Sequence, residues 1–363
     1  MEHHGQRVGC VAPRCTLSIM NTDVNGSPLL GRVTIADVAR EAGVSVPTVS
    51  KVVNGRYGVA PATFKRVTEV VAALGYETSL VAASLRRQRT NVIGILVPEF
   101  ESFSAELLKG ISTAATGTGY ELLAYSALAP GGISAGWERR SLSRLAGTLI
   151  DGAIIVTPTL LMPTTSIPVV AIDPHDGPGG PSTIDSDNIG GARVATRHLI
   201  ELGHRRIAHI RGRGDLVSAQ LREAGYRESL ENAGIPFDST LIRDGEYQAA
   251  LTAKAAHELL TRPDRPTALF AANDMSALGV LDAARELGLR VPEDVSVIGF
   301  DDIPEAASSM PPLTTIAQPL QDMGAQALRM LVKLLNGEDV PNHIQLPAEL
   351  VVRASTGPVP IGR

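Results

Sequence analysis

Residues Thr34 to Gly55 read Thr-Ile-Ala-Asp-Val-Ala-Arg-Glu-Ala-Gly-Val-Ser-Val-Pro-Thr-Val-Ser-Lys-Val-Val-Asn-Gly, and this stretch decides how the first part of the chain folds. Its first apolar residues recur at the i, i+3, i+4, i+7 spacing of one helical face: Ile35, Val38, Ala39 and Ala42. Gly43 comes next, and glycine readily adopts the left-handed conformation that ends a helix. The spacing therefore predicts a short amphipathic helix that ends at Gly43.

A second short helix is expected directly after this turn. Ser45 can cap it, and Pro47 falls in its first turn, where the missing N–H breaks no hydrogen bond. Its apolar side faces the first helix and consists of Val49, Val52 and Val53. Its outward side carries Val46, Pro47, Thr48, Ser50 and Lys51. Two helices around one tight turn are the minimal unit that places a helix in the DNA major groove, although an ordinary helical hairpin has the same pattern.

A third helix is predicted between Ala60-Pro61 and Gly75-Tyr76. Its apolar stripe consists of Phe64, Val67, Val70, Val71 and Leu74. Residues 79–85 follow, and then the basic run Arg86-Arg87-Gln88-Arg89. The three helices together would form a compact domain near the lower size limit for independent folding.

Charge is unevenly distributed along the chain. The 363 residues carry a formal net charge of −5. Residues 31–90 nevertheless contain nine Lys and Arg against four Asp and Glu, residues 1–30 are balanced, and the remainder is acidic. A basic module on an acidic body confines phosphate attraction to one end of the protein, which suits a DNA-binding protein.

Residues 33–90 resemble the DNA-binding headpiece and hinge of the LacI family of bacterial transcription regulators. The resemblance rests on residues 34–55, on Gly75-Tyr76 and on Val81-Ala82-Ala83-Ser84-Leu85. It implies a homodimer on a near-palindromic operator in double-stranded DNA, with Leu85 wedged into a base step from the minor groove. The residues expected at the DNA, with Thr48, Ser50 and Lys51 nearest the bases, are Thr34, Ser45, Val46, Pro47, Thr48, Ser50, Lys51, Asn54, Leu85, Arg86 and Arg87.

From Asn91 onward, strand and helix patterns alternate with short connections, which predicts parallel α/β sheets. One series starts with the apolar strand 92–97, and a second of similar size begins near Asp187. Two series indicate two lobes, each a parallel sheet with flanking helices. Ligands of open parallel sheets bind beyond the carboxyl ends of the strands, so a cleft between the lobes is the expected site.

Polar residues stand at several of these strand ends. Glu99-Phe100-Glu101-Ser102-Phe103 follows the first strand, and Asn273-Asp274 and Phe300-Asp301-Asp302 follow later ones. Arg222 belongs to a helix that follows a polar loop. Carboxylates, an amide and a guanidinium that converge on one cleft can bind a polyol through paired hydrogen bonds. The alternative is that Asp274 caps a helix and Asp302 begins a turn.

The body is similar to the periplasmic-binding-protein-like effector domain of the same family, so the resemblance covers residues 33–357. It rests on Gly203-His204-Arg205-Arg206-Ile207, Ala272-Asn273-Asp274, Gly299-Phe300-Asp301-Asp302 and Pro312-Leu313-Thr314-Thr315-Ile316. It implies that Arg222, Asn273 and Asp301 bind the effector, that Phe103 stacks near it and that Gln318 lies at a crossover between lobes. Other aromatic residues that could stack on a sugar are Phe100, Tyr125 and Trp137, whereas His204 is expected to be structural.

The expected domain organisation follows from the sequence pattern and from this resemblance. Residues 1–32 form a disordered leader, 33–77 the helix-turn-helix headpiece, 78–90 the hinge and 358–363 a tail. The effector-binding and dimerisation domain spans 91–357, with lobe 1 at about 91–186 and 318–347 and lobe 2 at about 187–317 and 348–357. The implied crossings between lobes lie near 186–188, 317–319 and 347–349.

The chain departs from the family pattern at several positions. Glu101-Ser102 replaces a common Asn-Pro, which puts first-lobe contacts in doubt. Val46-Pro47 replaces a polar pair, so base contacts there would be mainly apolar. Ala60 stands where a capping Ser is usual, and Thr78-Ser79 replaces Pro-Asn before the hinge.

The first 30 residues and the absence of other motifs limit the classes of protein to which the chain can belong. Residues 1–30 lack a signal peptide, no apolar run spans a membrane, and Cys10 and Cys15 fit no zinc pattern. We therefore expect a cytoplasmic, nucleoid-associated protein without metal or cofactor, translated from Met1 or Met20. No nucleophile elbow, P-loop or carboxylate pair indicates an enzyme.

The expected function is that of a dimeric repressor of carbohydrate-utilisation genes, released from DNA by a sugar. The tail after Thr356 has no heptads, so a coiled-coil tetramer is not expected. The alternative is a corepressor-dependent repressor or an activator that responds to a nucleoside, a purine or another small molecule.

Overall fold

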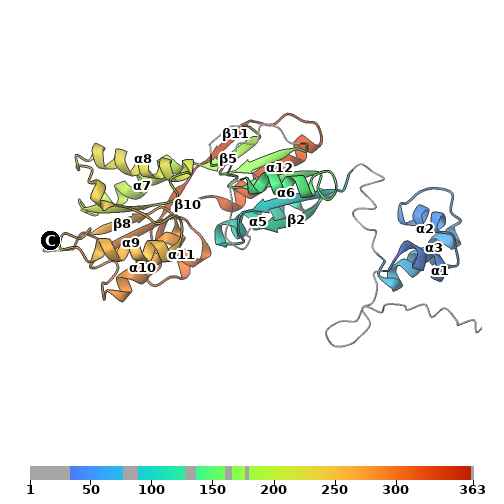
Figure 1. The fold of residues 1–363 in the computed structure, drawn as a ribbon, viewed down its shortest axis with the longest axis horizontal. Helices are drawn as coiled ribbons and strands as arrows, with labels where there is room; N and C mark the ends of the chain where they lie inside the picture. The colour runs from blue at the N-terminus through green and yellow to red at the C-terminus, as the bar shows by residue number, and fades with distance from the viewer. Residues whose placement is uncertain (1–32, 77–88, 127–135, 160–165, 176–179, 361–363) are drawn as a thin grey trace, which may run out of the picture. The chain divides into compact units, whose positions relative to one another are not determined.

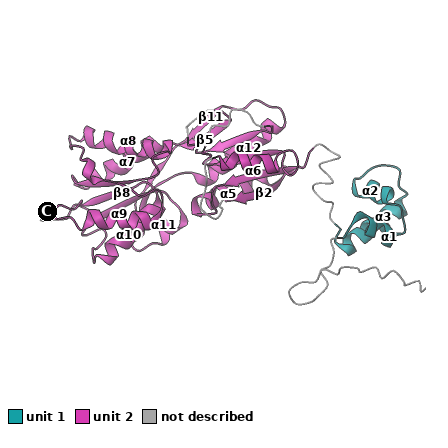
Figure 2. Cartoon of the chain, in the orientation of Figure 1, with its two compact units in different colours: residues 1–79 teal, residues 80–363 magenta. Residues whose placement is uncertain are grey.

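A computed structural model describes residues 33–76, 89–126, 136–159, 166–175 and 180–360. The chain divides into two compact units, residues 1–79 and residues 80–363 (Figure 2). Unit 1 is helical and unit 2 contains two six-stranded sheets with flanking helices, which confirms the predicted fold class. Within the described ranges, no helix is long and apolar enough to cross a membrane.

Unit 1 consists of three short helices, α1 (Ile35–Ala42), α2 (Val46–Val53) and α3 (Pro61–Leu74). A capping box starts α1, because Thr34 and Asp37 each accept a hydrogen bond from the other's backbone N–H. Gly43 ends this helix at φ 61°, in the left-handed region where a side chain would be strained. The predicted first helix and its stop are both confirmed.

The three helices share a small apolar core. Val38, Val49 and Val67, one from each helix, are fully buried in it. Two predictions about this unit are wrong. Ser45 begins α2 without capping it, since its hydroxyl bonds the Thr48 hydroxyl at 2.9 Å instead of a backbone N–H. Phe64 lies at the edge of the predicted stripe and is 43% exposed.

Unit 2 contains two lobes, and lobe 1 is built on a parallel sheet in the order β11-β5-β4-β3-β1-β2 (Figure 1). Its apolar strands are buried on both faces, as central strands of parallel sheets are. Helices α5 (Ser102–Ala115) and α12 (Leu320–Leu335) cover one face and α6 (Trp137–Leu145) the other. The strands are β1 (Val92–Val97), β2 (Glu121–Ser126), β3 (Gly152–Val156), β4 (Val169–Ile172), β5 (Ser182–Ser186) and β11 (His343–Leu346).

Lobe 2 repeats this plan with the order β12-β10-β9-β8-β6-β7. Helices α7 (Asn188–Glu201) and α8 (Val217–Asn232) cover one face, and α9 (Ala249–Leu260) and α10 (Asp274–Glu286) the other. Strand β12 runs antiparallel to β10, so this sheet is not purely parallel as expected. The strands are β6 (Ile207–Arg211), β7 (Ile242–Asp244), β8 (Ala268–Ala271), β9 (Ser296–Asp301), β10 (Thr314–Ala317) and β12 (Glu349–Val351), and the short helices η1 (Ser239–Leu241) and α11 (Pro304–Ser308) complete the lobe.

The chain passes between the two sheets three times. It leaves lobe 1 after β5, returns between β10 and α12, and enters lobe 2 again between β11 and β12. Three connecting segments therefore lie side by side between the lobes.

Candidate ligand-binding cleft and nucleic-acid interface

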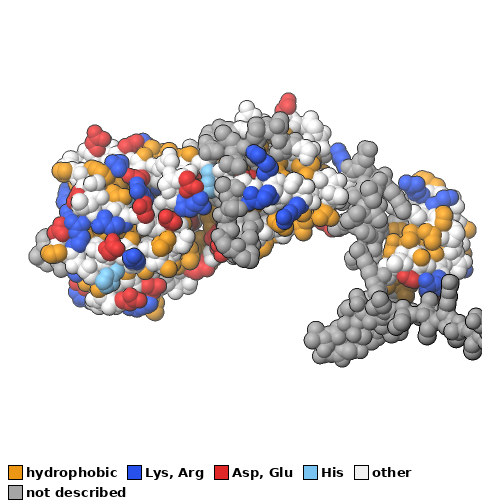
Figure 3. All heavy atoms as spheres, viewed as in Figure 1, with side chains coloured by type: hydrophobic (Ala, Val, Ile, Leu, Met, Phe, Trp, Pro, Cys, Tyr) orange, Lys and Arg blue, Asp and Glu red, His pale blue; other side chains and the backbone are white. Residues whose placement is uncertain are grey.

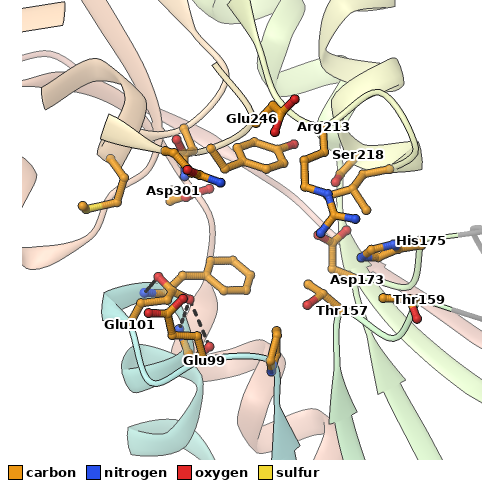
Figure 4. Close-up of a pocket in the computed structure, with 18 of the residues that line it drawn as sticks. Glu99, Glu101, Thr157, Thr159, Asp173, His175, Arg213, Ser218, Glu246 and Asp301 are labelled. Atoms are coloured by element: carbon orange, nitrogen blue, oxygen red, sulfur yellow. Dashed lines mark hydrogen bonds between the residues drawn. The ribbon is translucent and has the colours of Figure 1, made fainter. Parts of the chain in front are cut away.

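A cavity of about 520 Å³ lies within unit 2, and both lobes line it (Figure 4). This volume is in the range of small-molecule sites. Lobe 1 contributes residues that follow β1, β3 and β4, and lobe 2 contributes the starts of α8, α9 and α10 and the end of β9. The cavity therefore sits at the carboxyl ends of parallel strands, where open sheets bind ligands.

Arg222 of α8 is the buried cation of this site, with 4% of its side chain exposed. Its Nε donates to Asn188 Oδ1 at 2.9 Å and its Nη1 donates to the Ala272 carbonyl at 2.5 Å. The guanidinium carbon lies 3.8 Å from the centre of the Phe300 ring. Nη1 is also 3.5 Å from Asp301 Oδ1, so the charge is balanced by a carboxylate.

Asp301 ends β9 and lies opposite Arg222. Its Oδ1 accepts a hydrogen bond from Gln318 Nε2 at 2.6 Å. Burial raises the pKa of Asp301 to about 7, although the Arg222 guanidinium and the Gln318 amide act to lower it. Burial therefore opposes the ionised form of this carboxyl group, while the neighbouring Arg222 favours it.

Asp173 brings a second carboxyl group into the cavity from lobe 1. It directly follows β4, and Ser218 of α8 approaches its carboxyl group from the other lobe. Burial raises its pKa to about 6, with a further contribution from Asp185, while Arg222 opposes the change. Asp173 was not among the residues expected at the ligand, although it stands at the end of a buried strand, as Asp301 does.

Backbone strain is concentrated around this cavity. Among the described residues, seven other than glycine have a positive φ, and five of these line the cavity. Each such residue costs about 1–3 kcal/mol, and residues of this kind cluster at functional sites. The five are Thr157, Asp173, Glu246, Tyr247 and Asp301, with φ of 44°, 48°, 51°, 61° and 115°.

Four of the six residues expected at the ligand line the cavity, namely Phe103, Arg222, Asn273 and Asp301. Asn273 also caps α10, because its Oδ1 accepts the Ser276 N–H at 2.9 Å. Phe100 is 57% exposed and is not among the lining residues. Gln318 is also outside the lining, since its side chain is held between the Ser186 hydroxyl and Asp301 at the crossover.

The neighbouring acidic residues have structural contacts. Asp274 is fully buried and accepts hydrogen bonds from the Thr315 hydroxyl and the Ile303 N–H, so it joins the first turn of α10 to β10 and to the segment after β9, while Asn273 is the residue that caps α10. Asp302 forms an ion pair of 2.7 Å with Arg353. The structural role expected for His204 fits its buried hydrogen bonds to Thr267, Ser296 and the Gly357 carbonyl.

Several lining residues were not expected at the site. They come from loops and helix starts whose proximity depends on the way the two sheets face each other, so no local pattern indicated them. Trp137 lines the cavity and Tyr125 does not. No group of three or more potential metal-ligating side chains occurs in the part of the chain that the structure describes. The other unexpected lining residues include Thr157, Thr159, His175, Arg213, Ser218, Glu246, Tyr247, Gln248 and Met275.

Direct contacts join the two lobes at the cleft. Ser102 at the start of α5 donates its hydroxyl to Glu305 Oε1 of α11 at 2.5 Å. A second contact joins the start of α8 to the segment after β4, where the Val217 N–H donates to the His175 carbonyl at 3.1 Å. These contacts form only where the lobes approach each other, so the structure shows a closed cleft.

The candidate nucleic-acid interface is the outward side of α2. Val46, Pro47 and Lys51 are exposed, and Thr48 and Ser50 are partly exposed. Asn54 ends this helix and donates to the Ser50 carbonyl at 2.6 Å. Figure 3 shows Lys and Arg side chains beside apolar ones on unit 1. Leu85, Arg86 and Arg87 lie outside the described residues.

Comparisons with known proteins agree with this architecture. Residues 34–79 match the family described as bacterial regulatory proteins, lacI family, and residues 196–356 match a periplasmic binding protein-like domain.

Curated relatives are similar over almost their whole length. The HTH-type transcriptional repressor PurR of Aliivibrio fischeri (strain MJ11) is 38% identical over 336 residues, covering 89% of this chain and 98% of the relative. The HTH-type transcriptional regulator CelR of Thermobifida fusca is 37% identical over 340 residues, with the same coverage of 89% and 98%.

Solved structures show the same similarity. The lac repressor dimer bound to operator and the anti-inducer ONPF has a TM-score of 0.75 at 30% identity, covering 90% of this chain and 99% of that one. The complex of the transcriptional regulator CelR with cellobiose has a TM-score of 0.65 at 36% identity, covering 89% and 100%.

Proposed function

Because the chain belongs to the lacI family of bacterial regulatory proteins and is a transcriptional regulator rather than an enzyme, we propose that it is a repressor released from its operator by a small sugar. The observation that carries this proposal is the cavity between the lobes, with the buried Arg222–Asp301 pair at its centre. A cytoplasmic location and the domain bounds given above belong to the same proposal.

The proposed mechanism couples the cavity to DNA through the arrangement of the lobes. A ligand bound between the lobes shifts the populations of their open and closed arrangements. In a homodimer, this shift changes the separation of the two hinges. The ligand can shift operator affinity only by as much as its affinities for the two arrangements differ. Two α2 helices in successive major grooves would then bind or leave a near-palindromic operator.

On the DNA side, we propose that Thr48, Ser50 and Lys51 contact bases or nearby phosphates. Their partial or full exposure on one face of α2 supports this assignment. Val46 and Pro47 at the start of the helix suit apolar contact with thymine methyl groups. The further proposed DNA contacts are Thr34, Ser45, Asn54, Leu85, Arg86 and Arg87.

A sugar is the first candidate for the effector because a solved relative, CelR, is bound to cellobiose. The lining supports this choice, since it combines carboxylates and a guanidinium with the aromatic rings of Phe103, Trp137 and Tyr247. An unphosphorylated nucleoside or purine is the second candidate, and a corepressor or activator mode is the alternative to induction.

Substitution of Arg222 by Ala tests the role of the cavity. We expect Arg222→Ala to abolish the effector response and to leave operator binding intact, because the residue lies in unit 2, outside the headpiece. Gel retardation with the operator fragment, with and without a ligand found by thermal-shift screening, measures both properties. A ligand at 100 times its dissociation constant stabilises the folded state by about 2.7 kcal/mol.

A matched control is Arg197→Ala on α7, whose side chain is 63% exposed and should behave as wild type. Since Arg222 is buried, its replacement also leaves the Asp301 carboxyl without its cation, and thermal unfolding must show that the variant folds. Phe103→Ala gives a second test at a partly buried lining residue. Loss of operator binding by a folded Arg222→Ala protein would refute the assignment.

A further inference from the structure

The cavity lining has an excess of acidic over basic side chains. It contains five carboxyl groups and two guanidinium groups. Figure 4 shows several of these side chains facing one another from the two lobes. The carboxyl groups belong to Glu99, Glu101, Asp173, Glu246 and Asp301, and the guanidinium groups to Arg213 and Arg222.

Both guanidinium groups already have carboxylate partners within the protein. Arg213 binds Asp215 with two hydrogen bonds, Nε to Oδ1 at 3.1 Å and Nη2 to Oδ2 at 2.6 Å. Arg222 is paired with Asp301 and also donates to Asn188 and the Ala272 carbonyl. A phosphate group is normally bound by a cation that is free to form a bidentate contact, and neither arginine is free in this way.

Two of the helix starts at the cavity, those of α5 and α9, provide little compensation. At α5, the Glu101 carboxylate already accepts the N–H groups of Phe103 and Ser104, at 2.9 and 3.0 Å. At α9, no side chain caps the first N–H groups, but Glu246 lies close by in the lining. A helix start is equivalent to about half a positive charge, so these two starts together do not balance a surplus of three carboxyl groups over guanidinium groups.

The lining is well suited to an uncharged ligand with many hydroxyl groups. Carboxylates accept hydrogen bonds from hydroxyl donors, and the free N–H groups at the start of α9 can donate to hydroxyl oxygens. The rings of Phe103, Trp137 and Tyr247 can pack against the C–H face of a sugar ring. A phosphorylated ligand would instead place its negative charge among Glu99, Asp173 and Glu246.

We propose that the effector is an uncharged polyhydroxylated molecule, an unphosphorylated sugar, and that the surplus carboxylates of the cleft exclude phosphorylated sugars and nucleotides. This inference rests on the proposed function and adds the charge state of the ligand. It assigns Glu99 and Glu246, two exposed carboxylates of the lining, as residues that determine specificity.

The test uses the purified full chain and pairs of ligands that differ by one phosphate. The pairs are glucose and glucose 6-phosphate, ribose and ribose 5-phosphate, and inosine and inosine monophosphate, each followed by calorimetric titration. We expect any pair that binds to favour its unphosphorylated member by about tenfold or more in dissociation constant. A phosphorylated member that binds as tightly as its partner, or more tightly, would overturn the proposal.

Inorganic phosphate gives a result that does not depend on finding the sugar. Calorimetric titration should detect no binding to the wild-type protein with a dissociation constant below about 10 mM. In the double variant Glu99→Gln, Glu246→Gln, we expect phosphate or a phosphorylated sugar to bind about tenfold more tightly than to wild type. Tight phosphate binding to wild type, or an unchanged affinity in the double variant, contradicts the inference.

A double variant at exposed carboxylates outside the cavity is the matched control, Glu286→Gln, Glu349→Gln, and should bind all ligands as wild type does. Gel retardation of an operator fragment by the same samples separates this inference from the proposed function. A phosphorylated ligand that releases the operator overturns the charge inference alone. Failure of the unliganded protein to bind any operator counts against the proposed function, while the titrations still measure the preference of the cavity.

Discussion

At the scale of single residues, burial gives two carboxyl groups in the cleft unusual properties. Asp173 and Asp301 lie on opposite lobes and share Arg222 as the nearby cation, yet burial outweighs this attraction and raises the pKa of both. The protein thus keeps polar groups at the centre of the site at the expense of stability. Such a cost is typical of residues retained for binding rather than for folding.

The pKa of Asp173 predicts how stability depends on pH. Its value rises from 3.8 to about 6 on folding, so the native state binds the proton more tightly than the unfolded state does. The free energy of unfolding should therefore fall as the pH rises from about 4 to about 6, by up to about 3 kcal/mol from this group. An Asn side chain at this position cannot ionise, so the Asp173→Asn variant should lack the part of the pH-dependent fall in unfolding free energy that Asp173 causes.

Urea unfolding at several pH values between 4 and 7 checks this prediction. The fluorescence of Trp137, the single tryptophan of the chain, reports on lobe 1, which contains Asp173. Asp339→Asn, at an exposed position, is the control and should follow the wild-type profile. A constant difference between Asp173→Asn and wild type across the whole pH range would show that Asp173 does not titrate in this way.

At the scale of elements, helix starts determine which groups meet at the cleft. Helix α5 begins at Ser102 in lobe 1, and α11 begins at Pro304 in lobe 2, next to Glu305. The hydrogen bond of 2.5 Å between Ser102 and Glu305 holds these two helix starts together across the cleft. The segment Glu101-Ser102 departs from the family pattern, and the structure gives both residues a contact at the start of α5.

Ser102→Ala tests this contact between the lobes. A hydrogen bond to a charged group contributes about 1.5 kcal/mol or more, so its loss should favour the open cleft and weaken ligand affinity about tenfold. Calorimetric titration with a ligand from the thermal-shift screen measures the change. Ser143→Ala on the exposed side of α6 should leave the affinity unchanged. Equal affinities of Ser102→Ala and wild type would show that the contact does not stabilise the closed state.

At the scale of the whole molecule, DNA binding and ligand binding are assigned to different units. The headpiece helices lie in residues 1–79, and every residue that lines the cavity belongs to residues 80–363. Each lobe of unit 2 has its own sheet and apolar core. Unit 2 should therefore keep its fold and its ligand site without the headpiece.

Deletion of residues 1–90 tests this division. The truncated protein should no longer retard the promoter fragment in a gel, while the same ligand still raises its unfolding temperature. The first result follows because α1, α2 and α3 are removed, and the second because the cavity is intact. If the truncated protein retards DNA as well as the full chain does, the proposed function is wrong.

Local pattern in the sequence was sufficient for the helix-turn-helix unit and for most of the α/β body. The signals for these elements are contained within a few consecutive residues: the apolar period of α1, the glycine that ends it at Gly43, and the apolar run 92–97. Their structure can therefore be predicted without knowing what they pack against. Helix α12 was not among the predicted elements, although it covers one face of the first sheet. Arg222, Asn273 and Asp301 were expected at one site, and the structure brings all three to the cavity.

Tertiary structure decided the remainder of the site. Asp173 meets Ser218, and Ser102 meets Glu305, only because three chain crossings set two sheets face to face. The position of Gln318 behind Asp301, rather than in the cavity, likewise depends on where the second crossing lies. These contacts join residues that are far apart in the chain. Periodicity and spacing do not indicate which distant residues meet in space. Helix and turn patterns, in contrast, are set by neighbours within a few residues.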